Sequence, residues 1–282
     1  MTSTLAAATA SLKPSPRMPV LFVGHGSPMN AIENNAWRRS WQAVGADLLA
    51  RAARPQLILC VSAHWLTRGG WQVTGMARPR TIHDFGGFPQ ALFDQQYPAP
   101  GAPAVARGLA AELRSPATGG ALGVDEGEWG LDHGTWSVLK PMFPQADIPV
   151  LQLSMDYARP PSEHYALGQQ LRSLRERGVL IVGSGNVVHN LRLARFGTAA
   201  NAAYDWAVEF DTVVQEQIKN GQLGALQDFQ KLGPLARQAH PTHEHYLPLL
   251  YAAGAVQAGE MPRFFNTGYQ AASISMRSVL WG

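Results

Sequence analysis

The chain has 282 residues, of which 46% are hydrophobic and 15% charged, so it can bury one large core. Its 23 Lys and Arg and 20 Asp and Glu give a formal net charge of +3 without a basic run, which argues against a nucleic-acid partner. The single cysteine excludes an internal disulfide, and no apolar run approaches the roughly 20 residues that span a bilayer, so we expect a cytoplasmic protein without a membrane partner.

The N-terminal segment differs in composition from the rest of the chain. Residues 1–17 read MTSTLAAATASLKPSPR, which is small, polar and interrupted by proline, with no basic residue before Lys13. This composition predicts a disordered tail rather than a secretory signal. We expect one folded catalytic domain over residues 18–282.

The first predicted elements form a β-α-β unit. Residues 18–24 and 56–62 are apolar runs typical of buried strands, and residues 34–51 between them predict a helix. The helix is predicted from apolar residues at 3.6-residue spacing, namely Trp37, Trp41, Val44 and Leu48. Such a unit implies parallel strands with a right-handed crossover, and strands that are apolar throughout imply helices on both faces of the sheet.

The remaining elements continue an α/β pattern. Further strands are predicted over 71–76, 147–154 and 179–183. Further helices are predicted around 105–113 and over 162–177, the latter with Ser162 as N-cap and Gly178 as the stop. A helix lined by Trp206, Phe210, Val213 and Val214 ends at Asn220, and a last helix over 246–256 is expected to kink near Pro248. Residues 264–279 alternate as strands on either side of a turn. The sequence therefore predicts a single α/β domain with a central, mostly parallel sheet flanked by helices.

Three histidines come just past the apolar runs. His25, His64 and His189 each follow a predicted strand. Ligands in open α/β sheets bind beyond the carboxyl ends of the strands, and neutral imidazole is the commonest transition-metal ligand. A lone histidine at a strand end is usually an ordinary polar residue, but three in the same topological position predict a metal site at this edge of the sheet.

Two further histidines lie in segments rich in glycine and aromatic residues. Asp132 precedes His133 in DHGTW, where the aspartate either orients the imidazole as a general base or caps a helix beside a surface histidine. His83 lies in TIHDFGGFP, within the long segment 77–101, and is either functional or an ordinary loop histidine.

The segment HPTHEHY, residues 240–246, holds the last cluster. It is not the HExxH pattern, because one residue separates His243 and His245. Glu244 or His245 could complete a site begun by the strand-end histidines, since two histidines and one carboxylate are typical of non-haem Fe(II) oxygenases. A structural zinc site rich in sulfur is incompatible with one cysteine.

Six stretches together resemble a known family. They are GHGSPMN (24–30), SAHW (62–65), HDFGGFP (83–89), DHGTW (132–136), SGNVVHNLR (184–192) and HEHYLPLLYAAGA (243–255). In this order, and across nearly the whole chain after residue 17, they resemble the class III extradiol ring-cleavage dioxygenases, in particular the 4,5-DOPA dioxygenase type.

The resemblance implies an α/β fold with one metal at the carboxyl edge of the sheet. It also implies that both atoms of O₂ are inserted into a catechol next to its hydroxyls. Matched by motif, His25 and His64 are metal ligands, His189 is a ligand or an acid/base group, and His133 is the second acid/base group. The family's TPEHY pattern reads THEHY here, so Glu244 and His245 match its final ligand region, while His243 replaces its proline.

The resemblance also implies the cofactor and the substrate contacts. Fe(II) is the metal expected for activity, and zinc is a plausible bound ion because it stands above Fe(II) in divalent affinity. Ser27, His83 and Trp136 are candidate substrate-binding residues. Two alternatives are a tetrapyrrole metal chelatase, which also carries GHGS after its first strand, and a non-catalytic metal-binding protein of the same fold.

Overall fold

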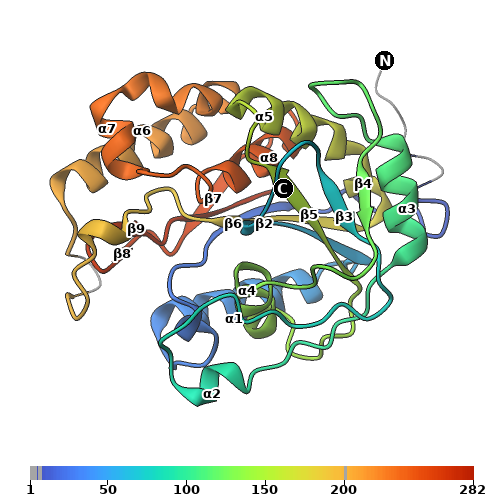
Figure 1. Ribbon diagram of the computed structural model, residues 1–282, viewed down its shortest axis with the longest axis horizontal. Helices are drawn as coiled ribbons and strands as arrows, with labels where there is room; N and C mark the ends of the chain where they lie inside the picture. The colour runs from blue at the N-terminus through green and yellow to red at the C-terminus, as the bar shows by residue number, and fades with distance from the viewer. Residues whose placement is uncertain (1–4, 6–7, 200–201) are drawn as a thin grey trace.

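A mixed eight-stranded sheet forms the centre of the computed structural model, which describes residues 5, 8–199 and 202–282 (Figure 1). The strand order is β4-β3-β5-β2-β6-β1-β10-β7, and β8 and β9 form a separate hairpin. The strands are β1 (Val20–Gly24), β2 (Leu57–Thr67), β3 (Gln72–Thr74), β4 (Gly123–Asp125), β5 (Val150–Asp156), β6 (Val179–Gly185), β7 (Pro262–Phe265), β8 (Tyr269–Gln270), β9 (Ile274–Ser275) and β10 (Ser278–Trp281).

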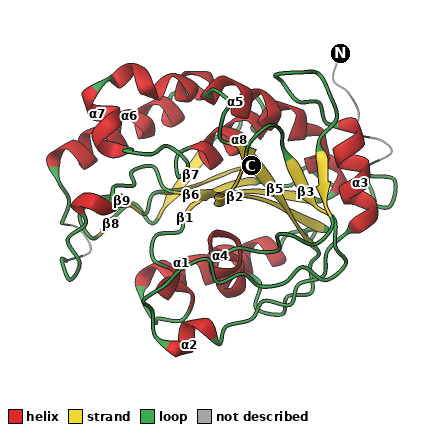
Figure 2. Ribbon diagram, in the orientation of Figure 1, coloured by secondary structure: helices red, strands yellow, loops and turns green. Residues whose placement is uncertain are grey.

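Helices cover both faces of the sheet (Figure 2). The α-helices are α1 (Ala36–Leu49), α2 (Gln90–Phe93), α3 (Pro103–Glu112), α4 (His133–Met142), α5 (Pro161–Gln170), α6 (Asp205–Lys219), α7 (Pro234–Ala239) and α8 (Leu247–Ala255), with 3-10 turns η1 (Pro28–Ala31), η2 (Leu171–Arg177), η3 (Leu191–Leu193) and η4 (Leu223–Leu232). In Figure 1, α1 and α4 lie below the sheet, and α5 to α8 lie above it. The predicted single α/β domain is confirmed.

The central strands are buried on both faces. β5, β2, β6 and β1 run parallel, with β2 paired to both β5 and β6 and with β6 paired to β1. Within β1, Val20 and Phe22 join the core shared with α5 and α8, whereas Leu21 and Val23 join the core shared with α1 and α4. This two-sided burial is the physical reason that the strands are apolar at every position.

The C-terminal segment completes the sheet with antiparallel pairs. β10 pairs with β1, and β7 pairs with β10, so the chain ends beside its first strand. The alternation predicted over residues 264–279 corresponds to parts of β7 and β10 with the β8–β9 hairpin between them. This hairpin lies next to the carboxyl end of β6, where Ile274 bridges His189.

Three local predictions are wrong for identifiable reasons. β2 continues through His64, because its pairing with β5 shifts register between Val61 and Leu66 and then resumes. Ser162 is not the N-cap of α5. The helix begins after Pro160, where no side chain caps it, since the prolines at its start already set the helical φ. Pro248 lies in the first turn of α8, where no backbone N–H is needed, so it does not kink the helix.

The segment expected to be a disordered tail lies partly outside the described residues, which omit 1–4 and 6–7. Its described part packs against the domain. Ala8 is buried against Gly108 of α3, and the backbone N–H of Ser15 donates to the carbonyl of Glu176 at 2.9 Å. The described fold therefore reaches further toward the N-terminus than residue 18.

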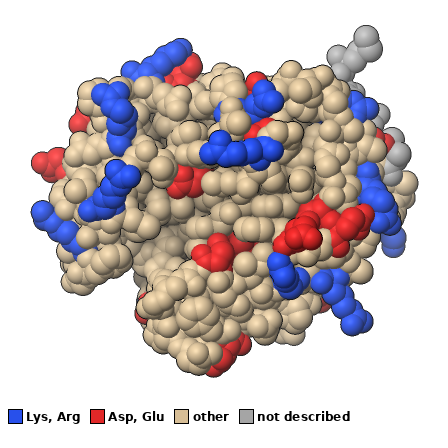
Figure 3. Space-filling model, in the orientation of Figure 1, with Lys and Arg blue, Asp and Glu red and all other residues tan. Residues whose placement is uncertain are grey.

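The surface is consistent with the charge pattern of the sequence. In the view of Figure 3, the Lys and Arg side chains are scattered over several elements rather than gathered in one patch. No helix in the described part of the chain combines the length and apolar character needed to cross a membrane.

The contact between α1 and α4 yields a stability prediction. A Cβ on Gly45 of α1 would lie 2.1 Å from the carbonyl oxygen of Met142 at the end of α4. We expect Gly45→Ala to lower the free energy of unfolding by about 1–3 kcal/mol through overpacking, although alanine is the better helix former. Urea unfolding measures the change. Gly127→Ala is the matched control, because a Cβ there meets nothing within 4 Å, and equal stability of the two variants would contradict the prediction.

Candidate metal centre

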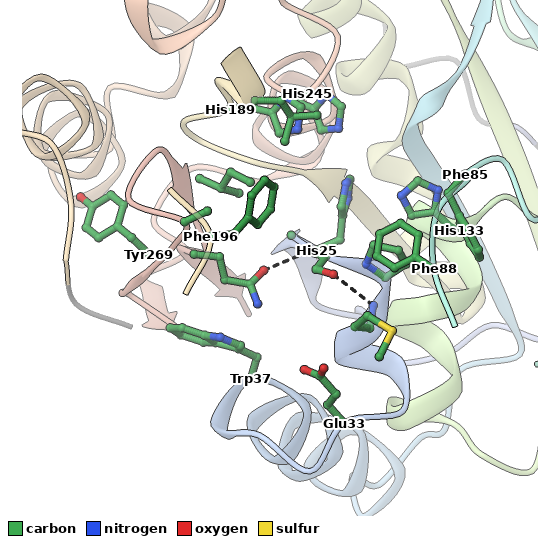
Figure 4. Close-up of a pocket in the computed structure, with 18 of the residues that line it drawn as sticks. His25, Glu33, Trp37, Phe85, Phe88, His133, His189, Phe196, His245 and Tyr269 are labelled. Carbon is green, nitrogen blue, oxygen red and sulfur yellow. Dashed lines mark hydrogen bonds between the residues drawn. The ribbon is translucent and has the colours of Figure 1, made fainter. Parts of the chain in front are cut away.

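A cavity of about 890 Å³ opens at the carboxyl ends of the central parallel strands. Five histidines line it, namely His25, His64, His133, His189 and His245 (Figure 4). They come from segments far apart in the chain, so the cavity assembles only when the sheet forms.

The strand ends fix where these imidazoles lie. His25 follows β1 directly, and its backbone N–H donates to the carbonyl of Gly185 at the end of β6. His245 lies before α8, and its carbonyl accepts a hydrogen bond of 2.8 Å from the backbone N–H of Asn186. A Cβ on Gly185 would lie 2.2 Å from that carbonyl oxygen, so only glycine lets the His245 segment approach the strand this closely.

Three of the rings converge on one point. His25 Nε2 and His64 Nε2 are 3.3 Å apart, and the ring of His245 lies 5.3 Å from that of His25 and 5.1 Å from that of His64 between centroids. One ring nitrogen from each of the three lies within 4.8 Å of the others. Three imidazole nitrogens at this spacing fit a single divalent transition metal.

Ser184 on β6 determines which ring nitrogen of His25 carries the hydrogen. The Ser184 hydroxyl donates its one hydrogen to the carbonyl of Gly134 at 2.5 Å and lies 3.1 Å from His25 Nδ1. Because that hydrogen is already used, the hydroxyl oxygen accepts a hydrogen bond from Nδ1–H of His25. The lone pair of His25 is therefore on Nε2, the atom that faces His64.

Carboxylates lie behind the other two rings, but only that of Glu244 forms a hydrogen bond with its ring. Asp84 Oδ2 lies 3.3 Å from His64 Nδ1, and Glu244 Oε1 lies 2.9 Å from His245 Nδ1. A carboxylate that accepts from Nδ1–H leaves Nε2 free to bind a metal and holds the ring in orientation. Glu244 thus contacts the His245 ring from behind, and it is not among the residues that line the cavity.

Asp84 is the functional candidate that the sequence analysis did not single out. Besides His64, its Oδ2 lies 3.0 Å from His133 Nδ1, and its Oδ1 accepts a 2.9 Å hydrogen bond from the backbone N–H of His133. Burial alone would raise the pKa of Asp84, but its interactions with His133 and His64 lower that pKa to about 2. The only signal in the sequence is its place beside His83 in HDFGGFP.

Asp132 has the second of the two expected roles, that of a helix cap. It caps α4, accepting a hydrogen bond from the backbone N–H of Thr135 at 3.1 Å, and it accepts another from the Ser62 hydroxyl at 2.7 Å. Burial, followed by the charge of Asp84, raises the pKa of Asp132 to about 6. The predicted cap is confirmed, but His133 is only 7% exposed and its carboxylate partner is Asp84.

His189 lies against one of the three converging rings. Its imidazole stacks on that of His245 with centroids 3.4 Å apart and planes 8° from parallel. Burial, and then the nearby His133, lowers the pKa of His189 to about 4. The ring is therefore uncharged at neutral pH, in contact with a prospective metal ligand and exposed to the cavity.

The converging imidazoles are uncharged as well. The pKa values of His25, His64 and His245 are all well below the ordinary value of 6.5. Burial is the largest cause in each case, and neighbouring imidazoles lower each pKa further. A metal ion would therefore meet free lone pairs at neutral pH rather than protons.

The residues expected to contact substrate fall into two groups. Ser27 lines the cavity, at the N-terminus of η1. His83 and Trp136 are not among the described residues that line it. His83 Nε2 lies 2.9 Å from the carbonyl oxygen of Gln95, and Trp136 is fully buried and donates from Nε1 to the carbonyl of Ile82. Both rings pack behind Phe85, which does line the cavity.

Comparisons with known proteins agree with this geometry. Residues 19–276 match the family described as the catalytic LigB subunit of aromatic ring-opening dioxygenase. The chain is 46% identical over 272 residues to a protein of Escherichia coli strain K12 named 4,5-DOPA dioxygenase extradiol, covering 95% of this chain and 96% of that protein. A protein of the same name from Beta vulgaris is 36% identical over 241 residues, covering 85% and 86%.

A solved structure also matches. The structure of a protein from Escherichia coli K12, described as uncharacterized, superposes with a TM-score of 0.79 at 40% sequence identity. The match covers 94% of this chain and 100% of that one.

The uncharged histidines predict an acid-sensitive fold. Between pH 6.5 and about 4, His189 binds a proton in the unfolded chain but not in the folded one, so the free energy of unfolding falls as the pH falls. His189→Gln should reduce this slope by up to about 1.4 kcal/mol per pH unit. Urea unfolding of both proteins at several pH values, with a chelator present to keep them metal-free, measures the slopes. Parallel profiles would show that folding does not lower the pKa of His189.

Proposed function

Because the chain belongs to the family of the catalytic LigB subunit of aromatic ring-opening dioxygenases, we propose that this dioxygenase opens catechols beside their hydroxyls at one divalent metal. The observation that carries the proposal is the convergence of one ring nitrogen from each of His25, His64 and His245, with a polar side chain behind each ring. DOPA is the first substrate to test, since relatives from two organisms are named for it.

We assign the metal to His25, His64 and His245. The donor set supports a transition metal, and three imidazoles leave coordination positions free for ligands from the cavity. Fe(II) is the metal proposed for activity, because an ion held by these three imidazoles would supply redox chemistry to a catechol and O₂ in the cavity. Zinc fits the same nitrogen donors but cannot change oxidation state, so a zinc-loaded protein would be inactive.

His189 is proposed as the base that takes a catechol proton. It lines the cavity beside His245, and its pKa, lowered to about 4, keeps the ring uncharged and able to accept a proton at neutral pH. His189 also lies near Glu244 and His245 in a second possible ligand group, so a ligand role is the alternative. The position of His25 Nε2 beside His64 Nε2 favours the first group as the metal site.

His133 is proposed as the second acid/base group. Asp84 contacts its Nδ1, which leaves Nε2 as the atom that exchanges a proton with a ligand in the cavity. The same carboxylate contacts Nδ1 of His64, so one side chain positions both a metal ligand and an acid/base group. Asp84 is ionised at neutral pH, because its interactions with His133 and His64 lower its pKa to about 2.

The cavity wall favours a flat aromatic substrate. Phe85 and Phe88 lie at the His133 side of the cavity in Figure 4 and can pack against a catechol ring. Ser27 is proposed to contact the substrate directly. His83 and Trp136 are proposed to act one layer further out, by holding Phe85 in place through ring contacts of 5.7 and 6.3 Å between centroids.

The reaction is tested by reconstituting metal-free protein with Fe(II) under anaerobic conditions. DOPA or another catechol is then added in air, and oxygen uptake and a yellow ring-opened product are followed together. We expect one O₂ consumed for each catechol opened. No oxygen uptake over a broad panel of catechols would overturn the proposal.

The ligand assignment predicts that His64→Ala loses metal and activity together. Removing one of three nitrogens should abolish stoichiometric iron, measured by elemental analysis after desalting. His243→Ala is the matched control, because His243 stacks on Tyr157 at 4.6 Å and does not line the cavity. Full iron occupancy in His64→Ala would remove this residue from the ligand set.

The acid/base assignment predicts a different result for His133→Ala. This variant should keep its iron, because His133 is outside the proposed ligand set, but it should turn over about 10²–10⁴ times more slowly. Iron content and kcat measured on the same sample separate the two effects. An unchanged kcat would return His133 to a purely structural role.

A further inference from the structure

The outer end of the cavity differs in chemistry from the histidine end. Glu33, Asn35 and Trp37 line it, and among the described lining residues none is Lys or Arg. Figure 4 shows Glu33 and Trp37 near each other at the end of the cavity opposite His189 and His245. A substrate whose ring reached the histidines could extend its side chain toward this acidic and aromatic end.

The Glu33 segment is held in place rather than left free. Its backbone N–H donates to the carbonyl of Met29 at 2.9 Å, and Asn35 Nδ2 lies 3.4 Å from Glu33 Oε2. Asn35 Nδ2 also donates to Asn30 Oδ1, and Asn30 Nδ2 donates to the carbonyl of His25. Hydrogen bonds therefore connect the acidic end of the cavity to the first proposed metal ligand.

The carboxylate of Glu33 is available to a ligand. In the described part of the chain, no Lys or Arg forms an ion pair with Glu33; Arg38, the basic residue bonded beside it, donates from Nη1 to the carbonyl of Ile32. Trp37 is half-buried beside it and offers an indole face. A carboxylate next to an indole is a combination that binds ammonium groups, through charge and through the negative face of the ring.

We propose that Glu33 and Trp37 form a subsite for a substrate ammonium group, so that the protein prefers catechols with an amine-bearing side chain over catechols with an acidic one. The inference rests on the proposed ring cleavage and specifies its substrate class. A zwitterionic side chain such as that of DOPA would place its ammonium at Glu33 and its carboxylate toward solvent. Because Glu33 is exposed, solvent and salt screen the interaction, and the preference should be modest.

The test compares three catechols whose side chains are cationic, uncharged and anionic. They are dopamine, 4-methylcatechol and 3-(3,4-dihydroxyphenyl)propionic acid, assayed with the Fe(II)-loaded protein. We expect kcat/KM to fall in that order, and Glu33→Gln to lower the ratio of dopamine to 4-methylcatechol by about three- to tenfold. Glu33→Lys should invert the order of the charged substrates, and added salt should weaken the preference of the unmodified protein.

Two further measurements keep the inference separable from the reaction. Glu209→Gln removes an exposed carboxylate on α6 that does not line the cavity, and it should leave the ratio unchanged. Anaerobic calorimetry measures binding of dopamine and 4-methylcatechol without turnover. Failure to cleave any catechol would overturn the proposed function, whereas cleavage or binding with the same ratio in Glu33→Gln would overturn the subsite alone.

Discussion

The cavity depends on keeping several buried imidazoles uncharged at close range. His25, His64 and His245 lie about 5 Å apart between ring centroids, where positive charges on all three would repel one another strongly. Burial removes the solvent that would stabilise those charges, so their pKa values fall well below the ordinary value. The same burial that destabilises the protonated rings leaves lone pairs that a metal can use.

A polar side chain lies behind each ring and orients it, and Asp84 opposes the effect of burial by raising the pKa of His64. Ser184 comes from β6, Asp84 from the loop before α2, and Glu244 from the segment before α8. The exposed end of the cavity has the opposite character, since Glu33 is a charged group in contact with water. The proposed metal site at the uncharged end and the acidic residue at the exposed end together account for the substrate class that we propose, a catechol ring with a cationic group.

Much of the architecture could be predicted from sequence patterns. Apolar runs gave the central strands, because strands buried on both faces must be apolar throughout, and helical spacing gave α1 and α6. The predicted ends of strands and helices were less accurate where contacts other than the predicted local pattern fix them. The register shift that carries β2 through His64 depends on its neighbour β5, and the capping of α5 depends on prolines rather than on Ser162.

The sequence by itself placed His25, His64 and His189 at one edge of the sheet, because parallel strands bring their carboxyl ends to one side. The motif resemblance determined the family and the candidate roles of His133 and His189. Only the tertiary structure decided that Asp84, not Asp132, contacts His133, and that Glu244 lies behind His245. These contacts either join segments that are distant in the chain or depend on the orientation of one side chain. Neither periodicity nor spacing encodes such information.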